Sequence, residues 1–200
     1  MNLQLSLFAH DKGLHNDIDE CLLLVSPDVR VANSVLGLKR GARSLCRGKG
    51  IVSNPHITIA RIYIRRGTEH YILPFLQLIC SSHQKFIVEL EDFASFEHRN
   101  SSCTIYIKVK EHQPFLDLAK DLKAVRKDLK KLGCRIDCLV NNPHLSLVRG
   151  LPFSNYKAAM PIYDDNIFRD SFVAEEILLS KRWTPNYDSH RVAFPLSPLN

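Results

Sequence analysis

Two copies of one eight-residue phrase constrain the fold of this 200-residue chain more than any other feature. Residues 54–61 read NPHITIAR and residues 142–149 read NPHLSLVR, so Asn, Pro, His and Arg recur at the same offsets. Apolar residues at alternate positions predict a strand for each copy, and the proline pre-sets the backbone that enters it. Each copy comes late in a similar run of elements, which predicts two related lobes that face one another across a groove.

Each copy also places two polar side chains together, because side chains alternate between the two faces of a strand. His56 and Thr58 share one face of the first strand, and His144 and Ser146 repeat this arrangement on the second. The aliphatic residues between them would anchor each strand in the core. In regular strands the arginine that ends each copy points to the opposite face, where a salt bridge is favoured over a phosphate contact.

The rest of the chain alternates apolar strand-like runs with amphipathic segments, which is typical of an α+β fold. Residues 1–19 are polar and lack periodicity, so we expect a leader there and a single domain over 20–200. Apolar residues three and four apart predict a helix over 113–132, and strict alternation predicts a strand over 103–109. Further strands are predicted over 21–25, 86–93, 172–180 and 191–194, further helices over 26–45, 71–80 and 154–160, and a loop over 94–102.

Charge and cysteine usage narrow the choice of partner and compartment. The formal net charge of +6 favours an anionic partner, although a mildly basic protein without one would carry the same charge. None of the six cysteines forms a CxxC pair, and the spacing of Cys134, Cys138 and His144 fits no standard zinc site. We find no signal peptide and no membrane-length apolar stretch, so we expect a cytoplasmic protein without disulfides.

The paired histidine and hydroxyl groups suit chemistry at a phosphorus atom. Imidazole has an ordinary pKa of about 6.5, so near neutral pH one ring can be neutral and the other protonated. The neutral ring can act as general base on water or a ribose hydroxyl, and the protonated ring as general acid on the departing alkoxide. The hydroxyls can donate hydrogen bonds to non-bridging oxygens, and this scheme uses no metal or other cofactor. The structural alternative is a duplicated loop cap and strand.

His56-Ile-Thr58-Ile and His144-Leu-Ser146-Leu resemble the paired His-x-Thr/Ser-x motifs of the 2H phosphoesterase superfamily. This superfamily includes 2′-5′ RNA ligase-like proteins and cyclic phosphodiesterases, and the resemblance extends over roughly 21–196. It implies two pseudo-symmetric lobes of antiparallel sheet with outer helices around a positively charged central groove. It also implies metal-independent hydrolysis or transfer at 2′,3′-cyclic or 2′-5′ phosphodiester bonds. By position, His56 and His144 would be the acid–base pair, and Thr58 and Ser146 would hold the phosphate.

Four further side chains are candidate substrate contacts. Arg47 and Lys49 lie in the basic loop before the first phrase, and Tyr106 and Lys108 lie on the polar face of the strand 103–109. An aromatic ring there could stack on a base, although ordinary surface exposure fits equally well.

We therefore expect a monomer that acts on RNA ends or a nucleotide and has no membrane partner. The sequence does not say which histidine is the acid and which is the base. Two alternatives stay open: a non-catalytic RNA- or nucleotide-binding module, and a 2′-5′ RNA ligase that runs the reverse reaction.

Overall fold

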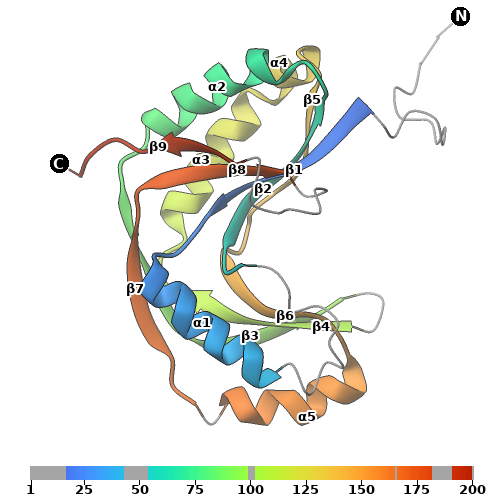
Figure 1. The fold of residues 1–200 in the computed structure, drawn as a ribbon, viewed down its shortest axis with the longest axis vertical. Helices are drawn as coiled ribbons and strands as arrows, with labels where there is room; N and C mark the ends of the chain where they lie inside the picture. Colours follow the sequence, from blue (N-terminus) through green and yellow to red (C-terminus); the bar gives the residue numbers. More distant parts are fainter. Residues whose placement is uncertain (1–16, 43–53, 99–101, 165, 182–190, 200) are drawn as a thin grey trace, which may run out of the picture.

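The computed structural model describes residues 17–42, 54–98, 102–164, 166–181 and 191–199. These residues form an α+β fold in which one antiparallel sheet of nine strands curls strongly (Figure 1). The strand order is β7-β3-β4-β6-β2-β1-β8-β9, and β5 pairs with β2 beside this path. The strands are β1 (Ile18–Val25), β2 (Ile57–Arg65), β3 (Phe86–Glu97), β4 (Ser102–Val109), β5 (Cys134–Leu139), β6 (His144–Pro152), β7 (Arg169–Ala174), β8 (Glu176–Lys181) and β9 (Arg191–Pro195).

The sheet has two corresponding halves that join where β2 meets β6. These strands pair antiparallel through Ile57 and Leu145. On one side of this contact the order runs β2, β1, β8, β9, and on the other side it runs β6, β4, β3, β7. Each repeated phrase therefore forms the innermost strand of its own half, and the expected fold of two pseudo-symmetric lobes is confirmed. The lobes share one continuous sheet.

Five helices of the described residues cover this sheet: α1 (Val29–Ala42), α2 (Glu69–Ser81), α3 (Gln113–Ala124), α4 (Arg126–Lys131) and α5 (Phe153–Asp164). Figure 1 shows α2 and α3 along the upper half of the molecule and α1 and α5 along the lower half. Helix α1 follows β1 but packs on β6 and β7, whereas α3 follows β4 and packs on β2. A helix from each half thus packs on the sheet of the other half, and α1 lies next to the second phrase.

Local sequence explains where α1 begins. The Asp28 carboxylate accepts a hydrogen bond of 2.8 Å from the backbone N–H of Val31, which satisfies one of the unpaired donors of the first turn. Val31 and Val35 are fully buried, four residues apart on one side of the helix. Position 39 continues that buried side.

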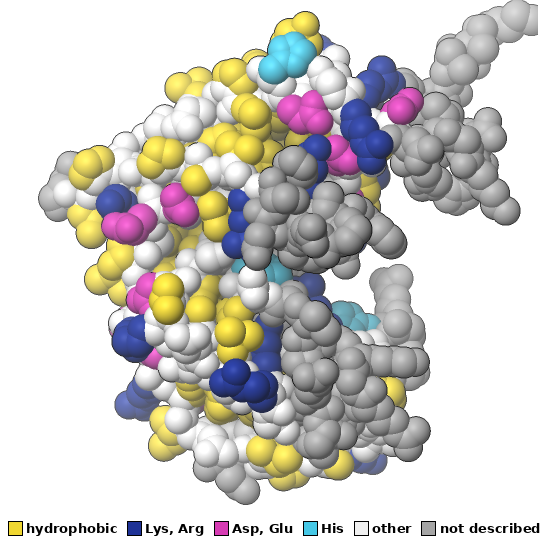
Figure 2. All heavy atoms as spheres, viewed as in Figure 1, with side chains coloured by type: hydrophobic (Ala, Val, Ile, Leu, Met, Phe, Trp, Pro, Cys, Tyr) yellow, Lys and Arg dark blue, Asp and Glu magenta, His cyan; other side chains and the backbone are white. Residues whose placement is uncertain are grey.

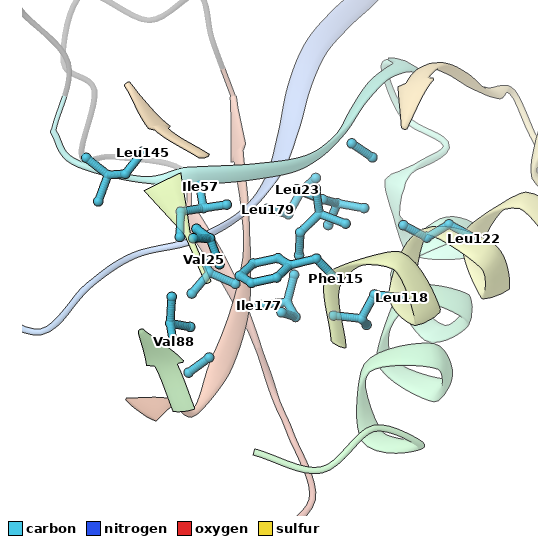
Figure 3. Close-up of a cluster of buried hydrophobic side chains, with 14 of the residues drawn as sticks. Leu23, Val25, Ile57, Val88, Phe115, Leu118, Leu122, Leu145, Ile177 and Leu179 are labelled. Carbon is cyan, nitrogen blue, oxygen red and sulfur yellow. The ribbon is translucent and has the colours of Figure 1, made fainter. Parts of the chain in front are cut away.

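Apolar side chains from both halves meet in one core (Figure 3). The fully buried Phe115 of α3 contacts the ring of Phe86 edge-on, with centroids 5.1 Å apart. The alternation predicted for 103–109 places Ile105 and Ile107 in the same core. Ile57 and Leu145 are also completely buried in it, so their neighbours along β2 and β6 face the opposite way.

Two strands differ from their sequence prediction. β3 continues to Glu97 and β4 begins at Ser102, so Phe96 lies in a strand and the loop predicted over 94–102 is wrong for 94–97 and for Ser102; residues 99–101 lie outside the described residues. A bulge at Asp92, with φ of 53°, interrupts the alternation before β3 resumes pairing with β4, which hides the strand in the sequence. β5 was not predicted, because its alternation spans only six residues with charged residues at two of them.

Several element boundaries also differ: for example, the helix predicted over 26–45 begins at Val29. The helix predicted over 113–132 is divided at Val125, and the strand predicted over 172–180 is divided at Glu175 into β7 and β8. β1 begins at Ile18, so the last residues of the expected leader belong to the sheet. The remainder of that leader, 1–16, lies outside the described residues.

Candidate active site

The register of the sheet brings the two repeated phrases into contact. Ile57 lies directly opposite Leu145, and both point into the core. Since neighbours along a strand point to opposite faces, the residues before and after this pair lie together on the other face. They are His56, Thr58, His144 and Ser146, and we call the surface that they form the motif face. Figure 2 shows histidine and Lys or Arg side chains at mid-height, between the upper and lower halves of the molecule.

β4 and β3 add side chains to the motif face beside the second phrase. Lys108 lies opposite His144 in the register and is exposed, whereas Tyr106 lies opposite Ser146 and is 9% exposed. The ring centroid of Tyr106 is 5.0 Å from that of His144. Phe96 meets the same imidazole edge-on at 5.4 Å. The centroids of the Phe96 and Tyr106 rings are themselves 5.4 Å apart, so His144 forms one cluster with these two aromatic rings.

Both motif strands contain a β-bulge just after the hydroxyl residue. The extra residue is Ile59 on β2, relative to β1, and Leu147 on β6, relative to β4. One extra residue shifts the alternation by one position, so side chains beyond it change faces. Arg61 and Arg149 consequently turn toward the motif face, and the expectation that they point away from it is wrong.

These two arginines make different contacts. Arg61 lies between two carboxylates, with Nη1 3.8 Å from Glu20 Oε1 and Nε 3.2 Å from Asp137 Oδ2. Its predicted role in salt bridges is confirmed. Arg149 instead donates a hydrogen bond from Nε to Ser146 Oγ at 2.9 Å, so it belongs with the motif hydroxyl.

The backbone before each histidine fixes which ring nitrogen carries a hydrogen. Nδ1 of His56 is 2.8 Å from the carbonyl oxygen of Asn54, and Nδ1 of His144 is 2.8 Å from that of Asn142. A carbonyl only accepts, so Nδ1–H donates in both cases and the neutral ring keeps its lone pair on Nε2. Nε2 of His56 is buried and has no hydrogen-bond partner among the described residues. The repeated Asn-Pro-His thus orients both imidazoles in the same way, with the lone pair on Nε2 of each neutral ring.

The two imidazoles lie in different electrostatic surroundings. Burial is the main cause that lowers the pKa of His56 to about 4, and the positive charges of Arg149, Lys39 and Arg191 act in the same direction. Burial also lowers the pKa of His144, with Arg149 acting in the same direction and the hydrogen bond to Asn142 opposing it. His56 is therefore neutral at physiological pH.

A comparison with protein families bears directly on these motifs. The model described as "2'-5' RNA ligase superfamily" matches residues 27–182, a range that contains both phrases. The chain belongs to the 2′-5′ RNA ligase superfamily. A comparison with curated protein sequences gave no match.

Solved structures share the fold of this superfamily member at low sequence identity. LigT of Escherichia coli complexed with 3′-AMP is 14% identical, with a TM-score of 0.59 over 88% of this chain and 95% of LigT. LigT complexed with phosphate is 13% identical, with a TM-score of 0.54 over 90% and 99% of the two chains. TT0787 of Thermus thermophilus is 19% identical, with a TM-score of 0.61 over 88% and 97%. These likenesses establish the fold.

Three side chains of the site were not candidate substrate contacts in the sequence. Lys39 is 3% exposed, and the signal that could have found it is its place four residues after Val35 on the buried side of α1. Phe96 falls in the predicted loop, and a bulge, which leaves no mark in a short apolar phrase, puts Arg149 on the face opposite to the predicted one. The candidates Arg47 and Lys49 lie outside the described residues.

No metal-binding cluster of three or more His, Cys, Asp or Glu side chains occurs within the described ranges. Cys134 is buried and Cys138 is exposed on β5. Within the same ranges, no helix is long and apolar enough to cross a membrane.

Proposed function

We propose that this protein is a metal-independent phosphoesterase that acts on 2′,3′-cyclic or 2′-5′ phosphodiester bonds of RNA or nucleotides. One observation carries the proposal: both Asn-Pro-His phrases aim an Nε2 lone pair from the same face of adjacent strands, each beside a hydroxyl. Two imidazoles and two hydroxyls supply both proton transfers and the hydrogen bonds to the phosphoryl oxygens.

For a 2′,3′-cyclic phosphate, water gives a proton to one Nε2 while its oxygen bonds to phosphorus. The bond from phosphorus to one ribose oxygen breaks, and that oxygen takes a proton from the other Nε2. The products are a phosphate monoester and a free ribose hydroxyl, and solvent returns the proton between the two rings. Thr58 and Ser146 donate hydrogen bonds to the non-bridging oxygens.

The surroundings of the histidines divide the two roles between them. A general base must be neutral, and the cations near His56 favour its neutral form. A general acid must be protonated, and the Tyr106 ring, whose centroid is 5.0 Å from that of His144, can stabilise an imidazolium there. His56 is accordingly the base and His144 the acid in hydrolysis. An anionic substrate raises the pKa of both rings when it binds.

The net charge of +6 supports an anionic substrate. The structural relative LigT was crystallised with 3′-AMP and with phosphate, which supports a nucleotide phosphate as the ligand class. A 2′-5′ ligase reaction would use the same groups in the reverse direction.

The test is a panel of 2′,3′-cyclic nucleotides and RNA with a cyclic-phosphate end, assayed in EDTA. We expect turnover by the wild type and a loss of about 10²- to 10⁴-fold in His56→Ala and in His144→Ala. His70→Ala, on the exposed side of α2, is the matched control. Unchanged turnover in either motif variant would refute the proposal. RNA binding that survives both substitutions, without turnover in the wild type, would favour the non-catalytic module.

A further inference from the structure

The duplicated phrase provides an internal comparison for its last residue, arginine. Arg61 is held by Glu20 and Asp137, two carboxylates of β1 and β5. Arg149, at the same offset in the second phrase, donates to Ser146. One copy of the arginine therefore neutralises acids, and the other lies at a hydroxyl of the motif face.

The hydrogen bond from Arg149 determines what Ser146 can do. Nε–H of Arg149 donates, so Ser146 Oγ accepts with one lone pair. The hydroxyl hydrogen then remains to be donated to a different acceptor, and a guanidinium beside it makes that donor stronger. Both groups favour an anion at the same place, and a planar guanidinium matches the geometry of phosphate oxygens.

A second cation lies within electrostatic reach of Arg149. Lys39, on the buried side of α1, is 3% exposed. Burial, followed by the charge of Arg149, lowers the pKa of Lys39 to about 8. Lys39 and Arg149 also both act on His56. Like charges that act on one another repel, and an anion bound near both relieves the repulsion.

We propose that Arg149 is a phosphate-binding residue of this site, and that the buried Lys39 is a positioning residue that supports it. The inference rests on the proposed function, because the phosphoryl group in question is the one attacked between His56 and His144. Negative charge on the non-bridging oxygens increases in the transition state. The guanidinium therefore stabilises the transition state more than the ground state, beyond what the two neutral hydroxyls provide.

The test compares Arg149→Gln with its internal control Arg61→Gln, in full-length protein of verified melting temperature. We expect Arg149→Gln to lower kcat on a 2′,3′-cyclic nucleotide by about 10²- to 10³-fold and to weaken binding of inorganic phosphate at least tenfold. Arg61→Gln keeps both values within about threefold, since the Arg61 guanidinium is already paired with two carboxylates. Arg149→Lys keeps the charge and recovers part of the phosphate affinity.

A double variant separates direct contact from an effect through Ser146. If Arg149 touches the phosphate, adding Arg149→Gln to Ser146→Ala causes a further loss in phosphate affinity. If the double variant equals Ser146→Ala alone, direct contact is refuted. Lys39→Met lowers phosphate affinity and Lys39→Arg restores it; equal losses in both would refute the positioning role.

The two hypotheses can fail separately. A wild type that turns over through both histidines, with Arg149→Gln as active as Arg61→Gln, overturns the inference and leaves the proposed function. A wild type without turnover that still binds phosphate through Arg149 overturns the proposed function and supports the anion contact. If Arg149→Gln does not fold, phosphate affinity of Arg149→Lys equal to the wild type counts against the inference, and a reduced affinity supports it.

Discussion

The two copies of the phrase share their backbone anchor and differ in what surrounds it. Each histidine donates from Nδ1 to the carbonyl of the asparagine two residues earlier, at the same distance of 2.8 Å. Around His56 the neighbouring charges are cationic, whereas His144 stands against two aromatic rings. The repeated sequence thus determines the orientation of both imidazoles, and the rest of the fold determines their pKa values.

This difference arises because neighbours are contributed unequally by the two halves. α1 packs on the second half, yet its Lys39 acts on the first histidine, whereas β3 and β4 bring Phe96 and Tyr106 to the second histidine. The sheet is therefore pseudo-symmetric, but the side chains that set the pKa values of the two histidines are not. Acid–base catalysis gains from such a difference, because the two groups must hold opposite protonation states at one pH.

The largest expected effect comes from changing the leaving group, which tests whether His56 is the base and His144 the acid. Replacing the ribose leaving group by p-nitrophenolate removes the need for a general acid, because the phenolate leaves without a proton. On such a substrate we expect His144→Ala to lose less than about tenfold in kcat, while His56→Ala keeps a loss of about 10²- to 10⁴-fold. Steady-state rates on paired alkyl and p-nitrophenyl phosphodiesters give both numbers.

The opposite pattern, with the loss in His56→Ala abolished by the good leaving group, would exchange the two roles. Equal losses for both variants on both substrates would show that neither imidazole is a general acid. His70→Ala should follow the wild type on both substrates.

Much of this arrangement was readable from the sequence, because the phrase is local and strongly patterned. Alternation in 54–61 and 142–149 was enough to place His56 with Thr58 and His144 with Ser146. Each pair is only two residues apart and lies before the bulge. The two lobes followed from the duplication itself. Alternation along a short strand determines which side chains share a face, and the duplicated phrase predicts the two related lobes.

The features that the sequence did not reveal depend on contacts between distant segments. The faces of Arg61 and Arg149 depend on a bulge that is defined only by the partner strand. Lys39 is buried because α1 packs across the molecule on β6, and a helical lysine is ordinarily solvated. Phe96 reaches His144 only because β3 resumes after Asp92. The sequence therefore predicts the motif residues of the site better than it predicts the side chains that surround them.

The pH profile of kcat/KM sharpens the comparison at a smaller scale. His56 must be neutral, and its pKa is about 4, so kcat/KM rises with pH through that value. His144 must be protonated, and its pKa is below the ordinary 6.5, so kcat/KM falls again before neutrality. The optimum lies on the acidic side of neutral, with apparent values that belong to the pair.

Removing the charge of Lys39 should shift only the acidic limb of the kcat/KM profile. Lys39 acts on His56, so Lys39→Met raises the pKa of His56 and moves the acidic limb to higher pH. We expect the alkaline limb, which reports His144, to stay in place. A profile in which both limbs shift together would mean that the two histidines do not have separate surroundings.

The smallest effect concerns the aromatic rings beside the second histidine. Tyr106→Leu removes the ring whose centroid is 5.0 Å from His144, and a cation–π contact of this kind contributes about 0.5 to 2 kcal/mol. We therefore expect kcat/KM on a ribose substrate to fall about 2- to 30-fold, and the His144 pKa, followed by NMR titration, to decrease further.

Matched variants separate this ring effect from a general loss of packing. Tyr106→Phe keeps the ring and should retain both the rate and the titration of His144. Tyr63→Leu, on the first motif strand, removes a ring that contacts Arg135 at 4.5 Å and should leave His144 unchanged. If Tyr106→Leu slows the p-nitrophenyl substrate as much as the ribose substrate, the ring acts on binding and not on the acid. The difference between the two motifs would then reside in the nearby charges, since Arg149 acts on both histidines and Lys39 and Arg191 act on His56.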